Sequence, residues 1–499
     1  MPLPAYQNGL KLAEQGRHSE AITAFELALA ERPNDTGVLY ALAGTARSLG
    51  LPAVALSFYA KVLDLEPERI EAVNGLGQLL CDTNEPEKAI ALLRPWVVRY
   101  DNCPEIKVTL GVALRQLNCS AEAELLFREA LALVPDFAPA LGNLADCLAD
   151  KGQLSAALEL YDRILKRDRN QHGARLNRAI VHLLNGDLKA GWRDYAARLK
   201  LPHKSPRPLH RLAPWSGGTL RNTRLLITAE QGVGDQIMFA SLIPELCVQA
   251  AHQGGRLLLE CDHRLKPLFA RSFPDIEVHA AHWQGREGVV EAQYDWLAAR
   301  GGANAAIALG SLARVLRPDL ASFPQPHAYL KADPDEQRRW QDWYKGLPAG
   351  RRIGLCWRSG KLGGGRALQY APLTLWADLM RVTAGEFMCL QYDAQQDEIA
   401  TLERLSGRTL HVPPCIDQKQ ELDRTAALLS CLDVMVSAPT AVSWMAAACG
   451  VRTCKPVYDT SWTSFGTSYE PFAPAAQVIS PDTPGDWSGC FAKVEEALK

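Results

Sequence analysis

Small and large side chains recur every 34 positions along the first 205 residues of the chain. One column of small residues comprises Gly9, Ala43, Gly77, Gly111, Ala145 and Ala179. A second small column comprises Ala21, Ala55, Ala89, Ala123, Ala157 and Gly191. Four positions after each member of the second column stands a large residue: Phe25, Tyr59, Leu93, Phe127, Tyr161 and Tyr195. Six rows in register predict repetition of one supersecondary unit.

The columns are those expected of paired helices. Two helices of one row can pack closely only where small side chains let their backbones approach, and the large residue one turn further on is expected to fill the gap between rows. Pro33, Pro67 and Pro135 end three rows, where the second helix must stop. One row cannot bury its apolar face alone, so the rows are expected to stack into a superhelix with a concave inner groove.

This pattern resembles the tetratricopeptide (TPR) repeat, whose inner groove holds extended polypeptide. We therefore expect an α-solenoid of about six helix pairs over residues 1–205 that binds a protein partner. Asn143 and Asn177 share one register on the first helix of their rows, where an asparagine side chain could bond a peptide backbone. The alternative is that both are solvated polar residues on an inner face.

The pattern changes after residue 205. A proline-rich and basic stretch predicts a linker at 206–218, and short apolar runs then alternate with helical ones, beginning with RLLIT at 224–228 and again with RRIGLCW at 351–357. Such alternation predicts parallel sheets with crossover helices. We expect one lobe at 219–335, a second at 336–480 and a last helix within 481–499.

The segment EQGVGDQIMFASLIPEL follows the strand at 224–228, with Gly232 and Gly234 permitting a tight turn and a helix beginning at about Asp235. A dinucleotide fingerprint would need glycine where Ile237 stands, which argues against NAD. A carboxylate at Asp235, facing a cleft, could take a proton from an acceptor hydroxyl. The alternative is that Asp235 only caps the helix.

Two later segments are typical of anion sites. After the strand at 351–357, Arg358, Lys361 and Arg366 surround a glycine run that suits diphosphate binding, unless it is only a basic surface loop. After the strand at 432–437, a helix is expected to begin near Thr440, so the free amides over 440–443 could bind phosphate. Thr440 as a simple helix cap is equally compatible with this pattern.

Two stretches, WSGGTLRNTRLLITAEQGVGDQIMFASLIPEL and LDRTAALLSCLDVMVSAPTAVSWMAAACGV, closely resemble the glycosyltransferase module that follows bacterial TPR arrays. The module is similar to the lipopolysaccharide heptosyltransferases and, more distantly, to the TPR-type O-linked N-acetylglucosamine transferases. The look-alikes include TPR glycosyltransferases of bacterial flagellin. The resemblance implies a GT-B fold of two Rossmann-like lobes, with the nucleotide sugar held mainly by the C-terminal lobe and no catalytic metal or other cofactor.

The resemblance also implies site residues. Gly234-Asp235 matches the glycine–aspartate turn whose aspartate is the base, and the donor segment maps onto Thr440, Ala441, Val442 and Ser443. Relatives usually carry an aspartate before the threonine and a histidine four residues after that aspartate. This chain has Pro439-Thr440 and then Ser443-Trp444, which removes a charge-capable phosphate ligand.

Composition narrows the function further. A net charge of -2 gives no electrostatic footprint for nucleic acid. No stretch approaches the length of an apolar membrane span, and thirteen singly placed cysteines suit a reducing cytoplasm better than a disulfide framework or a metal site.

The sequence thus predicts a cytoplasmic glycosyltransferase that moves a sugar from a nucleotide sugar to a serine or threonine hydroxyl of a protein held by the TPR groove, with flagellin the best guess. Two alternatives remain. One is a non-catalytic adaptor with a degenerate transferase domain, and the other is transfer to a lipid-linked saccharide.

Overall fold

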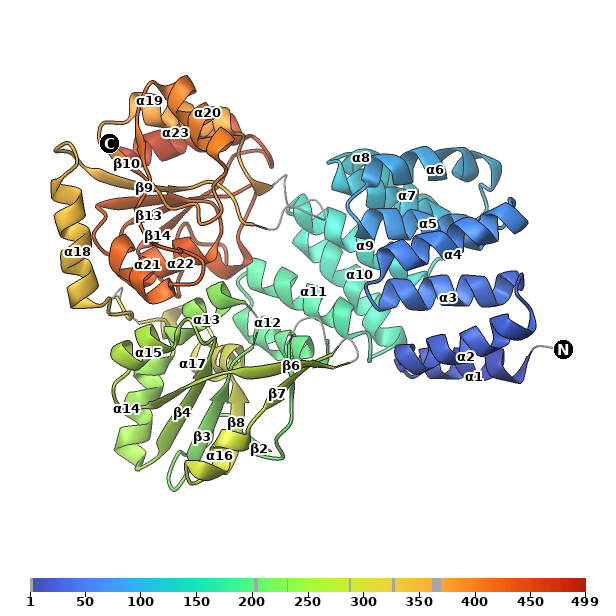
Figure 1. Cartoon of the computed structure of the whole chain (residues 1–499), viewed down its shortest axis with the longest axis horizontal. Coiled ribbons are helices and arrows are strands. Elements are labelled where there is room, and N and C mark those ends of the chain that lie inside the picture. The colour runs from blue at the N-terminus through green and yellow to red at the C-terminus, as the bar shows by residue number, and fades with distance from the viewer. Residues whose placement is uncertain (1–2, 202–204, 231, 287–288, 325–327, 361–368) are drawn as a thin grey trace.

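The computed structural model describes residues 3–201, 205–230, 232–286, 289–324, 328–360 and 369–499. An array of helices forms the N-terminal part, and two α/β bodies, each built on a parallel sheet, form the rest (Figure 1). The predicted solenoid followed by parallel α/β structure is therefore confirmed at this level.

The array consists of consecutive antiparallel helix pairs, as the 34-residue period predicts. In the described residues the pairs are α1 (Pro4–Glu14) with α2 (His18–Glu31), α3 (Thr36–Ser48) with α4 (Pro52–Leu65), α5 (Ile70–Asp82) with α6 (Pro86–Arg99), α7 (Pro104–Gln116) with α8 (Ser120–Leu133), α9 (Ala138–Asp150) with α10 (Leu154–Arg167), and α11 (His172–Leu184) with α12 (Leu188–Tyr195). Three of the second helices end two residues before the prolines that predicted their ends.

The small columns are required by close packing. A Cβ atom added to Gly111 would lie 2.5 Å from Cε1 of Phe127, and one added to Gly9 would lie 2.4 Å from Cε1 of Phe25. The large residue therefore fills the space between the two helices of its own row. Tyr59 also reaches the next row, because a Cβ at Gly75 would lie 2.6 Å from its ring. The large residues were expected to fill the gap between rows, but they also fill the space between the two helices of one row.

The last row joins the array to the α/β part. The 3₁₀ helix η1 (Ala196–Lys200) follows α12, and Trp192 packs edge-to-face on Phe465 and Phe472 while its indole nitrogen donates to the carbonyl of Arg317 at 2.9 Å. These residues belong to one apolar cluster that includes α11, both α/β bodies and the segment between them. The array is therefore packed against the α/β bodies rather than tethered to them.

The first body is a five-stranded parallel sheet in the order β2-β8-β3-β4-β5. Its elements are β2 (Ala213–Pro214), β3 (Arg224–Thr228), α13 (Val233–Ala240), α14 (Ile243–Gln253), β4 (Arg256–Cys261), α15 (Lys266–Ser272), β5 (Glu277–Ala280), α16 (Asp295–Ala299), β8 (Ala305–Ala308), η2 (Leu309–Ser311), α17 (Leu312–Leu316) and η3 (Leu320–Ser322). Beside it β1 (Arg207–Pro208), β7 (Val289–Gln293) and β6 (His282–Arg286) form a small sheet. The stretch 206–218, expected as a linker, thus contributes a short strand to each sheet.

The helix expected to begin at about Asp235 is followed, after a break, by a second helix. α13 ends at Ala240, and Pro244 occupies the first turn of α14, where a missing N–H is tolerated. Inside one continuous helix the same proline would remove a backbone hydrogen bond and clash with the preceding turn. The apolar pattern alone did not reveal this break.

The second body is a six-stranded parallel sheet in the order β11-β10-β9-β12-β13-β14. Its strands are β9 (Arg352–Cys356), β10 (Glu386–Cys389), β11 (Leu410–His411), β12 (Val434–Ser437), β13 (Thr453–Pro456) and β14 (Ala476–Ile479). Apolar clusters on its two faces place α19 (Leu373–Val382), α20 (Gln396–Ser406) and α23 (Trp487–Leu498) on one side, and α18 (Pro334–Lys345), α21 (Leu422–Leu429) and α22 (Ala441–Ala448) on the other. The carboxyl ends of β9 and β12 lie side by side, since Cys356 is in register with Ser437.

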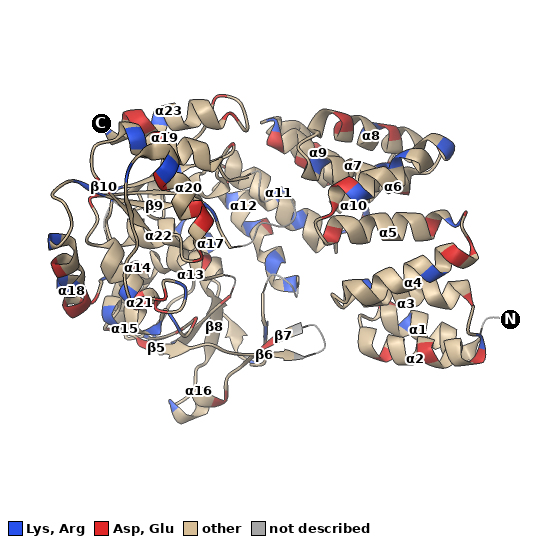
Figure 2. Ribbon diagram, turned by 45° about the horizontal axis from the view of Figure 1, so that its top comes forward, with Lys and Arg blue, Asp and Glu red and all other residues tan. Residues whose placement is uncertain are grey.

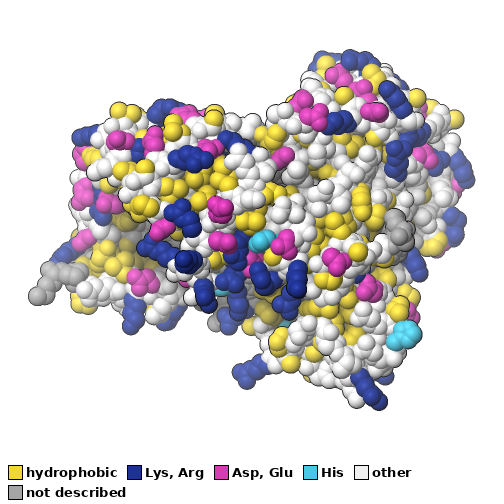
Figure 3. Space-filling view, turned by 180° about the vertical axis from the view of Figure 1, so that it is seen from behind, with side chains coloured by type: hydrophobic (Ala, Val, Ile, Leu, Met, Phe, Trp, Pro, Cys, Tyr) yellow, Lys and Arg dark blue, Asp and Glu magenta, His cyan; other side chains and the backbone are white. Residues whose placement is uncertain are grey.

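Charged residues of both signs are interspersed along the array and the α/β bodies (Figure 2). Seen from behind, lysine and arginine side chains gather near the middle of the molecule with acidic residues among them (Figure 3). Within the described ranges, none of the helices has the length and apolar character needed to cross a bilayer.

Candidate functional site

A cleft of about 990 Å³ lies where the array and the two α/β bodies meet. The array contributes residues of α7, α8, α9 and α11, the first body contributes α13, and the second contributes the start of α22 and the segment that follows β13. Asp235, Asn177 and Trp444 all line it. Clefts at the carboxyl ends of parallel strands are where ligands of such sheets bind, so this is the candidate site.

Asp235 lies in the first turn of α13, at the cleft wall. The helix begins at Val233, two residues earlier than expected, and Gly232 is its N-cap. One carboxylate oxygen of Asp235 accepts the backbone N–H of Gly232 at 3.3 Å, which is the half of a capping box that a glycine N-cap allows, since glycine has no side chain to accept in return. Asp235 is therefore a capping residue that also lines the cleft, so the two interpretations of this residue are compatible.

The glycines beside Asp235 are not there for a left-handed turn. Gly232 has φ -82° and ψ 168°, which is extended backbone open to any residue, and Gly234 lies within α13. A Cβ at Gly234 would lie 3.4 Å from Cα of Ala441 and 3.6 Å from Cδ1 of Trp444, an ordinary contact. The expected tight turn is thus replaced by close packing of α13 against the start of α22.

The predicted anion site is the start of α22. Thr440 is its N-cap and forms a capping box with Ser443: the Thr440 N–H donates to Oγ of Ser443 at 3.3 Å. Ser443 in turn donates its hydroxyl to the Thr440 carbonyl at 2.7 Å, and both side chains are buried. The Ser443 hydroxyl is therefore used within the cap, whereas the Thr440 hydroxyl lies 3.4 Å from the hydroxyl of Ser437 and 3.7 Å from Sγ of Cys356. Ala441 and Val442 supply first-turn amides, which have no partner within a helix.

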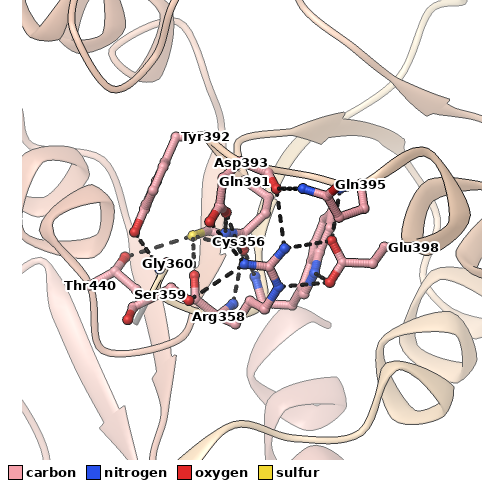
Figure 4. Close-up of polar contacts among 11 residues, drawn as sticks. Cys356, Arg358, Ser359, Gly360, Gln391, Tyr392, Asp393, Gln395, Glu398 and Thr440 are labelled. Atoms are coloured by element: carbon pink, nitrogen blue, oxygen red, sulfur yellow. Dashed lines mark hydrogen bonds and ion pairs between the residues drawn. The ribbon is translucent and has the colours of Figure 1, made fainter. Parts of the chain in front are cut away.

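Arg358 is held by acidic groups beside β9 (Figure 4). Its guanidinium donates to both oxygens of Glu398 at 2.7 Å and to both oxygens of Asp393 at 3.0 Å. The hydrogen bonds to Glu398 raise the pKa of Arg358 above its ordinary value. Burial by itself raises the pKa of Glu398, but the hydrogen bonds from Arg358, the Gln395 amide and the Trp357 indole together lower it below its ordinary value. Arg358 does not line the cleft. To bind phosphate it would have to leave these partners, while Lys361 and Arg366 lie outside the described residues.

The two asparagines predicted to bind peptide are in different settings. Asn143 donates its amide to the carbonyl of Pro139 at 2.9 Å, within its own helix, and is not among the cleft residues. Asn177 lines the cleft and donates to Asp146 at 3.4 Å. Asp146 is also bonded by Arg115 at 3.5 Å, and burial raises its pKa. The inner face is therefore a polar network, and the shared register of the asparagines does not give them a shared role.

The segment after β13 supplies cleft residues that the sequence reasoning missed. Tyr458 donates its hydroxyl to the side-chain oxygen of Asn118 in the array at 2.8 Å. Burial and the nearby carboxylate of Asp150 raise the pKa of Asp459 from 3.8 to about 6. Strand β13 (Thr453–Pro456) contains a lysine and a proline, which do not fit the apolar pattern of a buried strand, so the sequence pattern did not predict it.

A buried ion pair connects the array to the segment just before α13, the helix that contains Asp235. Arg198 and Glu230 have side chains only 1% and 4% exposed. Arg198 donates from Nε to Glu230 at 3.0 Å and makes a second, shorter bond from Nη2. Glu230 also accepts from the hydroxyl of Ser205 and from the amide of Gly310, each at 3.0 Å. The end of the array therefore fixes the chain three residues before α13 begins.

In the part of the chain that the structure describes, no group of three or more histidine, cysteine, aspartate or glutamate side chains is arranged to hold a metal ion. The cleft is lined by carboxylates, side-chain amides, hydroxyls and basic residues, among them the buried Lys455.

Comparisons with known proteins agree with the N-terminal half of this picture. Family models described as tetratricopeptide repeat match residues 6–70, 46–110 and 120–183, which confirms the repeat. Solved structures similar to the array include a thermophilic TPR protein from Thermus thermophilus, with 26% identity, 36% of this chain and 97% of that chain covered, and a TM-score of 0.34. Another is PilF of Pseudomonas aeruginosa, with 20% identity, 40% and 89% covered, and a TM-score of 0.32.

One relative covers nearly the whole chain. The protein FlbA of Caulobacter vibrioides is 31% identical over 489 residues, which is 97% of this chain and 82% of that protein. The similarity extends across both the array and the α/β bodies, so it concerns their combination and not the repeats alone.

Proposed function

This chain belongs to the FlbA family, and we propose that it is a glycosyltransferase with a GT-B arrangement of lobes that modifies a protein recruited by its TPR array. The observation that carries the proposal is the composition of the cleft. One wall holds a carboxylate, Asp235, another holds Pro439 and Trp444, which flank the first residues of α22, and the third is the inner face of the array. The three walls match an acceptor base, a donor phosphate site and a polypeptide surface.

The proposed reaction needs few groups. Asp235 takes the proton of a serine or threonine hydroxyl as the new bond to the anomeric carbon forms. The bond from that carbon to the phosphate oxygen breaks, and its electron pair stays on the nucleotide. The amides of Ala441 and Val442, at the positive end of the α22 dipole, stabilise the charge that appears there.

The array supplies the acceptor in this scheme. Its inner face lines the same cleft as Asp235, through Asn177 and Arg115 among others. A polypeptide lying along the groove would present its hydroxyls next to the base, and its tethering raises their local concentration. Flagellin is the proposed acceptor, on the sequence resemblance described above, and the cytoplasm is the proposed location, on the singly placed cysteines.

Asp235→Asn tests the proposal. Asparagine keeps an oxygen for the capping bond to Gly232 but cannot take a proton, so transfer should fall by roughly 10²-fold or more while partner binding is unchanged. The assay is mass spectrometry of a flagellin acceptor after incubation with CMP-, UDP-, GDP- and ADP-linked sugars. Asp187→Asn is the matched control, because Asp187 also caps a helix, α12, but does not line the cleft.

The non-catalytic adaptor keeps one observation in its favour. The guanidinium of Arg358 is bonded to Glu398 and Asp393, so this expected phosphate ligand is occupied. If the wild-type protein binds its partner but transfers no sugar from any of the four donor classes, the adaptor replaces the transferase. If Asp235→Asn transfers at the wild-type rate, the assignment of the base is wrong.

A further inference from the structure

Lys455 and Glu470 form a buried ion pair at the wall of the cleft. Lys455 is 3% exposed and Glu470 is fully buried, and the lysine amine donates to Oε1 of Glu470 in a short contact. The hydroxyl of Ser461 donates to the same oxygen at 3.2 Å. The other oxygen, Oε2, has no hydrogen-bond partner among the described residues.

Stability alone does not explain why Lys455 and Glu470 are buried as a charged pair. Removing two charges from water is unfavourable by several kcal/mol for each ion, and apolar residues of the same volume often stabilise a core equally well. An unsatisfied carboxylate oxygen adds to that penalty. Lys455 lies in β13, whose other residues are also buried, so the sheet does not need a charge at this position.

Trp444 connects this lysine to the proposed reaction centre. The amine of Lys455 lies 4.7 Å from the centre of the Trp444 ring system. A Cβ at Gly234 would lie 3.6 Å from Cδ1 of the same indole. The lysine and the turn that carries Asp235 thus both contact one side chain, and Asp235, Trp444 and Lys455 all line the cleft.

Lys455 differs from the other basic residues that line the cleft. Among the described residues that line it, the other lysines and arginines are Arg115 and Lys151, which belong to the array. Lys455 is the one contributed by the α/β bodies, and it lies against the first turn of α22. By the resemblance described above, this is also the region where Ser443 and Trp444 stand in place of an expected histidine.

We propose that Lys455 binds the phosphate of the nucleotide donor and supplies the cation that this histidine position lacks. The inference rests on the proposed function. A lysine amine has three donors, so it can keep its bond to Glu470 and still donate to a phosphate oxygen. Glu470 then acts as a positioning residue that fixes the amine beside Trp444.

In the transfer step the acceptor oxygen bonds to the anomeric carbon and its proton goes to Asp235. The carbon–oxygen bond to phosphate breaks, and the leaving nucleotide keeps the electron pair as additional negative charge. Lys455 stabilises that charge through a hydrogen bond between ionised groups.

The test is nucleotide binding by the full-length protein, measured by calorimetry with CMP, UDP, GDP and ADP. Lys455→Met should weaken the binding of the preferred nucleotide by about 10- to 100-fold, the range for loss of a hydrogen bond between charged groups. Lys151→Met is the matched control, because Lys151 lines the cleft but bonds Glu124 in the array at 2.5 Å. The control should bind within about twofold of the wild type.

A second variant protects the test from misfolding, since Lys455→Met leaves Glu470 buried without its cation. Lys455→Met combined with Glu470→Leu removes both charges and should fold, yet show the same weakened binding. If the wild type binds a nucleotide and the double variant binds it equally well, the inference about Lys455 is overturned while the proposed function stands. If the wild type binds none of the four nucleotides, the proposed function fails and this inference fails with it.

Discussion

The ion pair between Arg198 and Glu230 makes a quantitative test of how the array and the α/β part are joined. Arg198→Met keeps an apolar side chain at this buried position but removes the guanidinium, which lies over the Tyr195 ring, and leaves Glu230, 4% exposed, without a cation. Loss of one partner of a buried pair typically destabilises a protein by about 3–5 kcal/mol. Glu230 keeps two neutral donors, from Ser205 and Gly310, so we expect the lower end, about 3 kcal/mol.

A double-mutant cycle separates the pair from its surroundings. Glu230→Gln alone leaves Arg198 buried without its anion and should cost a similar amount, whereas the combined variant contains no uncompensated charge. The combined variant should therefore be more stable than the sum of the single changes by about 2 kcal/mol. The measurement is urea denaturation followed by tryptophan fluorescence, with Trp192 in the affected interface. A loss below about 1 kcal/mol for Arg198→Met, or strictly additive changes, would refute the reasoning.

The same pair decides where the array can be cut. A fragment that begins at residue 201 lacks Arg198, while one that begins at His172 keeps α11, α12 and η1. We expect the longer fragment to fold and the shorter one to unfold at clearly lower urea concentration. If the acceptor is a lipid-linked saccharide, the protein should transfer sugar without most of its array. The fragment that begins at His172 is therefore the one to use in that test. Equal stability of the two fragments would contradict the structural role of Arg198.

Two further predictions concern packing and pH. Gly111→Ala should lower the melting temperature, because the new Cβ would lie 2.5 Å from the buried Phe127 ring, an overpacking penalty of about 1–3 kcal/mol. Gly142→Ala is its control and should be neutral or stabilising, since its Cβ would meet only Ile164 at 3.8 Å; the opposite order would contradict the packing argument. For Asp459, whose pKa rises from 3.8 to about 6 on folding, the unfolded chain releases this proton first, so stability falls as pH rises from about 4 to 6. Because solvent screens this half-exposed group, Asp459→Asn should raise the free energy of unfolding by up to about 1 kcal/mol at pH 7 and leave it unchanged at about pH 3.5. The measurement is the melting temperature at the two pH values, and a stabilisation that does not depend on pH would contradict this titration.

Most of the fold could be predicted from the sequence because it depends on local periodicity. The 34-residue columns predicted the helix pairs, since Gly9, Gly77 and Gly111 each meet the large residue of their own row. The strand at 224–228 and the helix start after Thr440 lie where the apolar runs and the capping residue placed them. Pro244 lies in the first turn of α14, a position that proline favours, and it therefore marks the start of a second helix. The apolar pattern alone predicted one continuous helix there.

The site was less predictable, because its residues come from distant parts of the chain. Asp235 was identified from a turn motif, and the structure places it at the cleft. Arg358 stands two residues after β9 as expected, but its guanidinium points into a pair of carboxylates that its own neighbourhood did not reveal. Lys455 follows no motif, and only the packing of β13 beside α22 places its amine against Trp444.

The sequence by itself determined that the chain pairs a TPR array with parallel α/β structure, because helix and strand periods are recorded in the order of apolar residues. Only the tertiary structure decided that the array is fixed to the α/β part through Arg198 and Glu230, and that Asp235 and Lys455 share one cleft with its inner face. The physical reason is that burial and pairing of charges depend on which distant surfaces meet, and no periodicity along the chain records that.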